Sequence, residues 1–275
     1  MSHWYTRDGK PAHTQPTKKG AKNKERPTTA KEAQTLGLFP SVSDILKMAA
    51  NPGLDRWKMC QVVKACYDCP AGLDSYEEYE AVMLEKAGLE AADAAELGTR
   101  IHAAIESYFT HPDDPLDDEM KDYVFPVIDT IERLSITPVS HEVVTVVPNL
   151  GYAGTTDMAF ISGPFNGILD FKSTKTKPDE PVVPRQGHIA QIAAYHRSYW
   201  SHGKPIEDNA IGYNIYISTT EPGRVQVSKY DAATLRRELE WFDLCLGLWR
   251  HKYWDSRAHG TAEGESLEAL SDLAN

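Results

Sequence analysis

The fold is decided by residues 152–173, which read YAGTTDMAFISGPFNGILDFKS. Two runs rich in apolar, aromatic and β-branched residues lie on either side of a glycine and a proline, and this pattern predicts a β-hairpin. We centre its turn between Pro164 and Phe165, so that Met158 pairs with Phe171. The apolar side chains of both runs then share one face, which we expect to be buried.

Charged side chains gather on the opposite face of this hairpin. In this register Asp157 stands across from Lys172, and Asp170 lies one step away because strand side chains repeat every two residues. A second hairpin precedes the first, and a turn centred just after Asn149 places Glu142 opposite Asp157. One face of a three-stranded meander would therefore collect three carboxylates and a lysine.

Three carboxylates at such close quarters repel one another unless a cation lies among them. Oxygen ligands suit a hard divalent cation such as Mg²⁺ or Mn²⁺ better than they suit zinc. A lysine beside that cation can orient or deprotonate a water molecule, or stabilise charge that develops on a phosphate. The alternative is a solvent-exposed sheet face with alternating charges, which is common in antiparallel sheets.

The rest of the chain surrounds this meander with helices and further strands, in an order that predicts the α+β class. The predicted strands cover residues 142–147, 152–162, 167–173, 210–218 and 224–229, and the main predicted helices cover 91–109, 187–201 and 231–254. We divide the chain into a basic flexible arm (1–36), a helical region (37–136), a sheet-containing core (137–255) and a loose C-terminal tail (256–275).

Charge is distributed unevenly along the chain. The net charge is −11, but residues 1–31 hold eight Lys and Arg against Asp8 and Glu25. This pattern predicts a basic arm on an acidic body, and the arm is either a solvated leader or a contact for nucleic-acid phosphates. The acidic balance of the whole chain is unusual for a dedicated duplex-DNA binder.

Hydropathy and cysteine usage bear on the compartment. No apolar run approaches the length of a membrane span, and the first residues lack the apolar stretch of a secretory signal. Four cysteines without framework spacing fit a reducing compartment, so we expect a cytoplasmic protein that does not enter a membrane.

Five short motifs together resemble a known family. Gly154–Asp157, Asp170–Lys172 and Gln191–Tyr195 are similar to the G-x-x-D, D-x-K and Q-x-x-x-Y motifs of RecB-type nucleases in the PD-(D/E)XK superfamily. Gly98–His102 resembles the histidine motif of that family, and Pro40–Leu46 resembles the opening of the mitochondrial genome-maintenance exonucleases and their phage relatives. The resemblance covers roughly residues 40–200 and implies a restriction-endonuclease-like core with a helical N-terminal region.

The resemblance also implies roles for single residues. His102, Asp157, Asp170 and the backbone carbonyl of Phe171 would ligate Mg²⁺ or Mn²⁺, and Lys172 would position or activate the attacking water. Gln191 and Tyr195 would brace the site and contact the nucleic acid, and their spacing of four places them on one helix face. Glu142 is a candidate ligand of a second metal, and His188, on the same helix face as Gln191, is a candidate DNA contact.

The function that follows is that of a Mg²⁺- or Mn²⁺-dependent deoxyribonuclease. We expect an exonuclease that prefers single-stranded DNA with free ends and acts in phage-type replication or recombination. The alternatives are a structure-specific endonuclease of the same fold, a catalytically silent DNA-binding module, and an HD-type metallohydrolase acting on nucleotides. The last reading is prompted by His102, His111 and Asp113, but the prolines around His111 predict a loop where that class needs helices.

Some RecB-type nucleases bind an iron–sulfur cluster (4Fe–4S) through four cysteines, usually one early and three late in the chain. Here Cys60, Cys66 and Cys69 come early and Cys245 comes late, which reverses that arrangement. We therefore expect separate thiols and no cluster.

Overall fold

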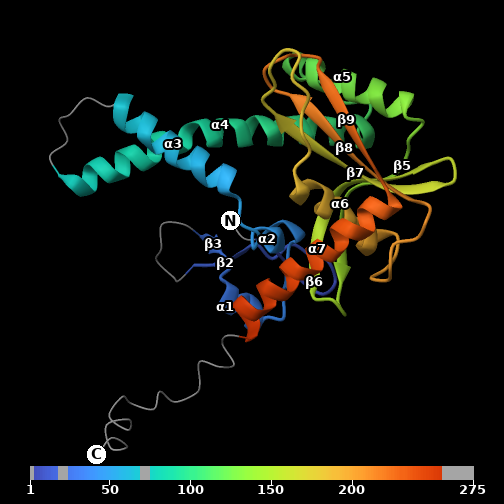
Figure 1. Cartoon of the computed structure of the whole chain (residues 1–275), viewed down its shortest axis with the longest axis horizontal. Coiled ribbons are helices and arrows are strands. Elements are labelled where there is room, and N and C mark those ends of the chain that lie inside the picture. Colours follow the sequence, from blue (N-terminus) through green and yellow to red (C-terminus); the bar gives the residue numbers. More distant parts are fainter. Residues whose placement is uncertain (1–2, 18–23, 69–74, 256–275) are drawn as a thin grey trace, which may run out of the picture.

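The computed structural model describes residues 3–17, 24–68 and 75–255, and the predicted loose tail lies outside them. A five-stranded mixed sheet forms its centre, with the strand order β5-β6-β7-β8-β9 (Figure 1). The strands are β5 (Thr137–Val147), β6 (Tyr152–Ser162), β7 (Phe165–Thr174), β8 (Ala210–Ser218) and β9 (Val225–Asp231). Only β7 and β8 pair in parallel, and the helix between them supplies the crossover that a parallel pair requires.

Helices cover both faces of this sheet, in agreement with the predicted α+β class. On one face lie α4 (Tyr76–Thr110) and α5 (Asp118–Arg133), which share a buried cluster with Met158, Phe160, Leu169 and Phe171. On the other face lie α2 (Val42–Leu46), α6 (Gln186–Tyr199) and α7 (Ala232–Arg250). The predicted apolar face of the hairpin is therefore buried, under α4 and α5.

The register of the β6–β7 hairpin differs from the prediction by two residues. Met158 pairs with Leu169, and Ser162 and Phe165 close a two-residue turn. Gly163 begins that turn with φ +57, at the position where such turns favour glycine. The predicted turn lay one residue too late, so the pairing of Asp157 with Lys172 is wrong. A shift of two residues leaves every side chain on its predicted face.

The β5–β6 hairpin has the predicted register. His141 pairs with Met158 and Val143 pairs with Thr156, so Glu142 lies opposite Asp157 as expected. Glu142 itself has φ +42, a left-handed conformation that costs a non-glycine residue energy. Such backbone strain is found most often at functional sites.

The described part of residues 1–36, which we predicted to be a basic flexible arm, contains regular secondary structure. Short strands β1 (Trp4–Tyr5), β2 (Thr14–Pro16) and β3 (Glu25–Pro27) are followed by α1 (Ala30–Thr35) and β4 (Phe39–Pro40). Trp4 and Tyr5 are only 3% and 4% exposed, and Trp4 joins the core beneath α7. These two buried aromatic rings attach the segment to the core of the protein. The high lysine content of the segment gives no sign of them.

The helical region is not a separate layer. A hairpin of α3 (Pro52–Asp68) and the first half of α4 projects from the body, whereas the end of α4 reaches the sheet (Figure 1). Helix α4 is longer than predicted and ends at Thr110, ahead of the His111-Pro112 segment. The described part of the chain contains no helix long and apolar enough to cross a membrane.

Candidate metal centre

The candidate site lies where β6 and β7 separate. Their backbone pairing runs from Ser162–Phe165 to Met158–Leu169. Beyond that pair the amide of Phe171 donates a hydrogen bond of 2.7 Å to Oδ2 of Asp157. The carbonyl of Phe171 points to the same edge of β7, because N–H and C=O of one strand residue lie on one side.

Three side chains from three elements converge where β6 and β7 separate. We call this group of His102, Glu142 and Asp157 the fork. One potential ligand atom each from His102, Glu142 and Asp157 lies within 4.8 Å of the other two. His102 comes from α4, and its Nδ1 lies 3.6 Å from Oδ2 of Asp157. This combination of one imidazole and two carboxylates is a donor set that Mn²⁺ or Mg²⁺ can accept.

The acidic groups of the fork are hard to ionise in the absence of a cation. Burial raises the pKa of Glu142 to about 7, and the charges of Asp157, Glu106 and Asp170 act in the same direction. Burial and then the charge of Asp170 raise the pKa of Asp157 to about 6, although His102 and Lys172 oppose this. A divalent cation would reverse both effects, because it favours the ionised carboxylates.

Asp170 lies beside this trio and takes part in a different set of contacts. It is 1% exposed, and its Oδ2 lies 2.6 Å from Nζ of Lys172. The same oxygen accepts a hydrogen bond of 3.0 Å from Nδ2 of Asn214, whose Oδ1 accepts one from the hydroxyl of Tyr230. The structure thus brings Asp170 and Lys172 together as predicted, but turns Asp170 toward the lysine.

Lys172 is half-buried yet held in its charged form. Burial lowers the pKa of Lys172, but the charges of Asp170 and Asp157 and the hydrogen bond to Asp170 outweigh this, so the pKa is raised. Nζ of Lys172 also donates to Oε1 of Gln191 at 3.1 Å, and Nε2 of Gln191 donates to the hydroxyl of Tyr195 at 3.4 Å. This chain of contacts fits the bracing role expected for Gln191 and Tyr195.

The expected contact between Tyr195 and a nucleic acid does not fit its burial. Tyr195 is 3% exposed, so its ring offers no surface for stacking. The ring packs against Gly154, where an added Cβ would meet Cε1 of Tyr195 at 2.7 Å. The glycine of the G-x-x-D motif is therefore required for close packing of α6 on β6.

A second glycine sets the position of His102. An added Cβ on Gly98 would meet Oγ of Ser173 at 2.6 Å, so the absence of a side chain allows α4 to approach β7 closely. His102 lies four residues further along α4 and thus on nearly the same face. Its ring stands at right angles to that of Phe171, with centroids 6.0 Å apart.

The remaining predicted histidines lie outside the trio. Nδ1 of His188 lies 3.1 Å from the hydroxyl of Tyr216, and burial together with the charge of Lys172 lowers the pKa of His188 to about 4. His111 and Asp113 occupy the exposed segment after α4, as the prolines predicted. The helical pair that an HD-type site needs is not formed by these two residues.

Asn214 and Glu106 also lie at the site, although none of the sequence motifs includes them. Asn214 interrupts the apolar run of β8, and a single amide in a fully buried strand is a signal that could have been used. Glu106 follows His102 by four residues on α4, so helical spacing could have suggested it.

The three cysteines within the described residues lie on two helices. Cys60 and Cys66 lie on α3, and Cys245 lies on α7 with its side chain buried in the core. Cys69 lies outside the described residues. The expected absence of an iron–sulfur cluster therefore stays a prediction.

Comparisons with known proteins give little further information. No protein-family model matches the chain, and no curated protein matches it. The crystal structure of SSO0001 aligns with 70% of this chain and 86% of its own, at 14% identity and a TM-score of 0.30. A TM-score of 0.30 is too low to relate the two folds.

Proposed function

We propose that the protein is a metal-dependent deoxyribonuclease with a PD-(D/E)XK-type, restriction-endonuclease-like core. The observation that carries this proposal is the proximity of the acidic fork to an ionised, half-buried lysine. Glu142, Asp157 and His102 lie within ligand distance of one another, and Lys172 lies next to them through Asp170. Phosphodiester hydrolysis uses both groups, because negative charge develops on the phosphate as water attacks.

The fork fits a divalent cation on the chemistry of its donors. The raised pKa values of Glu142 and Asp157 reflect crowded, desolvated acids that a cation would relieve. A bound Mg²⁺ or Mn²⁺ would polarise the phosphate and lower the pKa of a bound water. His102, Asp157 and Glu142 would hold it, with Asp170 and the Phe171 carbonyl adjacent.

The side chains around the fork supply orientation and charge. Lys172 orients the attacking water or stabilises the charge that develops on the phosphate oxygens. Gln191 holds the lysine from the side of α6 through its hydrogen bond of 3.1 Å. Because Asp170, itself held by Asn214, fixes Lys172 in a half-buried position, little reorganisation is needed when substrate binds.

Within this proposal we favour an exonuclease that acts on single-stranded DNA with free ends, in phage-type replication or recombination. Support for this finer assignment comes from the motif resemblance. The competing assignments are an endonuclease of the same fold and a DNA-binding module without activity. The ionised Lys172 beside the buried Asp170 argues against the silent module, since binding alone gives no reason to bury the carboxylate of such a pair.

One experiment separates these readings. Linear and circularised forms of one end-labelled oligonucleotide, and a blunt duplex, are incubated with the protein and Mg²⁺ or Mn²⁺. We expect rapid loss of the linear strand, slower loss of the duplex and an intact circle. Lys172→Ala should remove most of the cleavage, whereas Lys229→Ala, an exposed lysine on β9, should not. Equal cleavage of the circle and the linear strand would identify an endonuclease. DNA binding without cleavage in the presence of either metal would identify a DNA-binding module without activity.

A further inference from the structure

Two neighbouring cavities lie beside the candidate metal centre and share part of their lining. The smaller, of about 370 Å³, is lined by Lys172 and by the segment that leads from β7 to α6. The larger, of about 810 Å³, lies between the start of α3, the start of α6 and one side chain of α7. Arg185 and His188 line both cavities, so the two are adjacent. They form a track that begins at Lys172.

The smaller cavity is basic in a chain whose net charge is −11. Lys172, Lys175, Lys177 and Arg185 line it, against one acidic side chain, Glu180. Lys175 pairs with Glu90 at 2.5 Å and Lys177 pairs with Glu180 at 3.6 Å. Arg185 is exposed and has no ion pair with any residue in the described ranges. Its guanidinium is therefore available to an anionic ligand.

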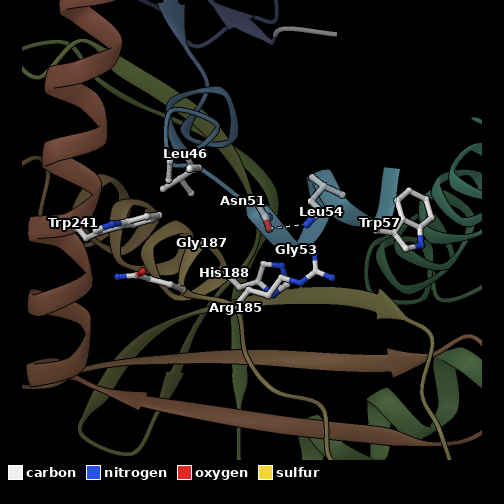
Figure 2. Close-up of a pocket in the computed structure, with 12 residues that line it drawn as sticks. Leu46, Asn51, Gly53, Leu54, Trp57, Arg185, Gly187, His188 and Trp241 are labelled. Atoms are coloured by element: carbon white, nitrogen blue, oxygen red, sulfur yellow. Dashed lines mark hydrogen bonds between the residues drawn. The ribbon is translucent and has the colours of Figure 1, made fainter. Parts of the chain in front are cut away.

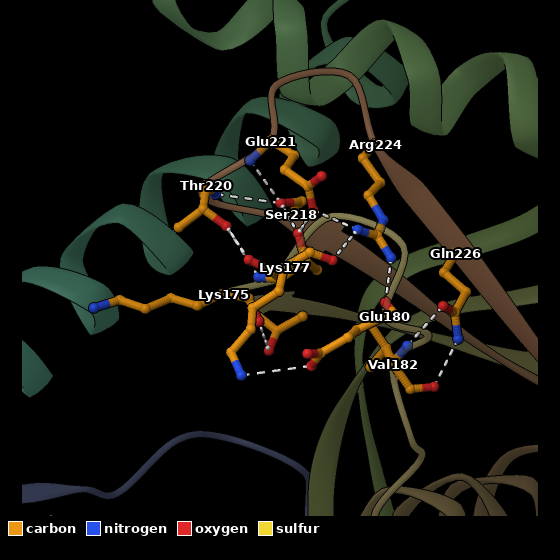
Figure 3. A network of polar contacts seen from close by, with 11 residues as sticks. Lys175, Lys177, Glu180, Val182, Ser218, Thr220, Glu221, Arg224 and Gln226 are labelled. Carbon is orange, nitrogen blue, oxygen red and sulfur yellow. Dashed lines mark hydrogen bonds and ion pairs between the residues drawn. The ribbon is translucent and has the colours of Figure 1, made fainter.

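The wall of this cavity is fixed by contacts from the β8–β9 hairpin (Figure 3). The guanidinium of Arg224 donates to the carbonyl oxygen of Lys177 at 2.7 Å and also to that of Glu180. Gln226 exchanges two hydrogen bonds of 2.7 Å with the backbone of Val182. The segment between β7 and α6 therefore has a defined backbone conformation, although most of its residues are exposed. The backbone positions of its lysines along the cavity wall are fixed in the same way.

The larger cavity contains two aromatic rings. Trp57 extends from α3 and Trp241 from α7, and they lie on opposite sides of the pocket with Arg185 and His188 between them (Figure 2). Trp57 is 37% exposed. An indole at the surface of a pocket offers a flat apolar face, which suits the face of a nucleobase.

We propose that these two cavities form the binding track for single-stranded DNA on one side of the scissile phosphate. The proposal rests on the nuclease function above and names the path of its substrate. Backbone phosphates lie against Lys172 and Arg185, and successive bases pack against Trp57 and Trp241. Only unpaired bases expose their faces, so such a track selects single strands over duplex.

Binding measured without metal tests the track separately from catalysis. A fluorescent twelve-nucleotide oligothymidylate is titrated with the protein in EDTA, and anisotropy gives the affinity at several salt concentrations. We expect Trp57→Ala and Trp241→Leu each to weaken binding about tenfold, since stacking on one aromatic ring contributes on the order of that factor. Leucine at position 241 keeps an apolar side chain against the core. Arg185→Ala should lower the slope of log affinity against log salt by about one unit.

The matched controls for the two tryptophan variants lie on the same helices as the tryptophans. Met59→Ala on α3 and Leu244→Ala on α7 remove side chains that are 63% and 69% exposed and that do not line the track. Arg133→Ala on α5 removes an exposed cation outside both cavities. We expect these variants to bind as the wild type does.

Two results would overturn the track. One is wild-type affinity in both tryptophan variants, and the other is an equal loss of affinity for a blunt duplex of the same length. Hydrolysis of bis(4-nitrophenyl) phosphate by the wild-type protein with Mn²⁺ tests the nuclease function by itself. A protein that hydrolyses this small diester but fails the binding test retains the function and loses the track.

Discussion

Oδ2 of Asp157 accepts a hydrogen bond of 2.7 Å from the backbone amide of Phe171, at the point where β6 and β7 stop pairing. A side-chain oxygen thus occupies the position that a backbone carbonyl would take in a continued ladder. The same oxygen lies 3.6 Å from Nδ1 of His102. The carboxylate of Asp157 is therefore oriented by the strand itself, before any cation or substrate arrives.

This geometry predicts opposite effects of Asp157→Asn on stability and on metal binding. The amide oxygen of asparagine can still accept from Phe171, while the charge that repels Glu142 and Asp170 is lost. Without metal we expect the variant to be at least as stable as the wild type. We expect its affinity for Mn²⁺ to fall at least tenfold, because one charged ligand is missing. Thermal denaturation in EDTA and calorimetric titration with Mn²⁺ measure the two effects, and wild-type affinity for Mn²⁺ would remove Asp157 from the ligands.

Lys172→Ala should affect stability as well as cleavage. Asp170 is 1% exposed, and removal of the lysine leaves its charge with Asn214 as a neutral partner. We expect the free energy of unfolding without metal to fall by about 2 kcal/mol, less than for a fully buried pair because the side chain of Lys172 is 23% exposed. Saturating Mn²⁺ should restore part of this loss but not the cleavage. Unchanged stability in EDTA would show that the pair contributes nothing to the fold.

The contact between Gly98 and Ser173 can be tested with a double-mutant cycle. Gly98→Ala should destabilise the protein, because its Cβ would meet Oγ of Ser173 at 2.6 Å. In a Ser173→Ala background the clash disappears, and the same change should stabilise α4 by about 0.5–1 kcal/mol through helix propensity. Gly88→Ala on the same helix meets no atom within 4 Å and should stabilise in both backgrounds. Additive effects of Gly98→Ala and Ser173→Ala in chemical denaturation would contradict the close approach.

Much of the sheet could be predicted because its alternation of apolar and charged residues is strong. The face of each residue in β6 and β7 was predicted correctly even though the register was not, since an error of two residues preserves alternation. The difference in register arises at Gly163, where φ +57 permits a tighter turn than the predicted one. Turn geometry is a local property that a hydrophobic pattern does not determine.

Other features of the fold and of the site depend on tertiary packing, and local sequence patterns could not predict them. The two anchors Trp4 and Tyr5 stand alone among polar residues, so no periodicity marks them as buried. Asn214 contacts Asp170 because β8 pairs in parallel with β7 and places the two residues side by side. The order of the predicted strands and helices along the chain does not reveal which strands pair. Asp170 lies outside the three-donor group, and its Oδ2 instead contacts both Lys172 and Asn214.

The role of the basic residues near the N-terminus needs a test that leaves the fold intact. Removal of residues 1–31 would also remove Trp4, which packs in the core, and we expect a loss of several kcal/mol of stability, on the order of 3 kcal/mol for the indole alone. Substitution of Lys18, Lys19 and Lys22 by Gln leaves that anchor in place. If these lysines contact DNA, the salt dependence of binding should fall by roughly one unit per lost phosphate contact. An unchanged slope would assign them to a solvated leader.

The last prediction concerns the acidity of the fork. The pKa of Glu142 is raised from 4.5 to about 7 in the folded protein. The stability that follows from this shift is fully present below pH 4.5 and is lost as the pH rises through 7. The raised pKa of Asp157, about 6, acts in the same sense. Burial lowers the pKa of His188 and of His196 to about 4, and these shifts reduce the stability of the protein as the pH falls below 6.5. The effect of Glu142 is therefore measured as a difference in stability between variants that share both histidines.

Without metal we therefore expect the wild type to lose stability relative to Glu142→Gln as the pH rises from 5 to 8, because the glutamine never ionises. With saturating Mn²⁺ the difference should reverse, since the cation binds the ionised carboxylate and stabilises only the protein that has it. Glu221→Gln is the matched control, because Glu221 is half-buried, is not one of the three donors of the fork, and has a lowered pKa, chiefly through the hydrogen bond from Thr176. Its effect on stability should be constant across this range and insensitive to Mn²⁺. A stability difference between the wild type and Glu142→Gln that varied with neither pH nor Mn²⁺ would mean that Glu142 is not part of a metal centre.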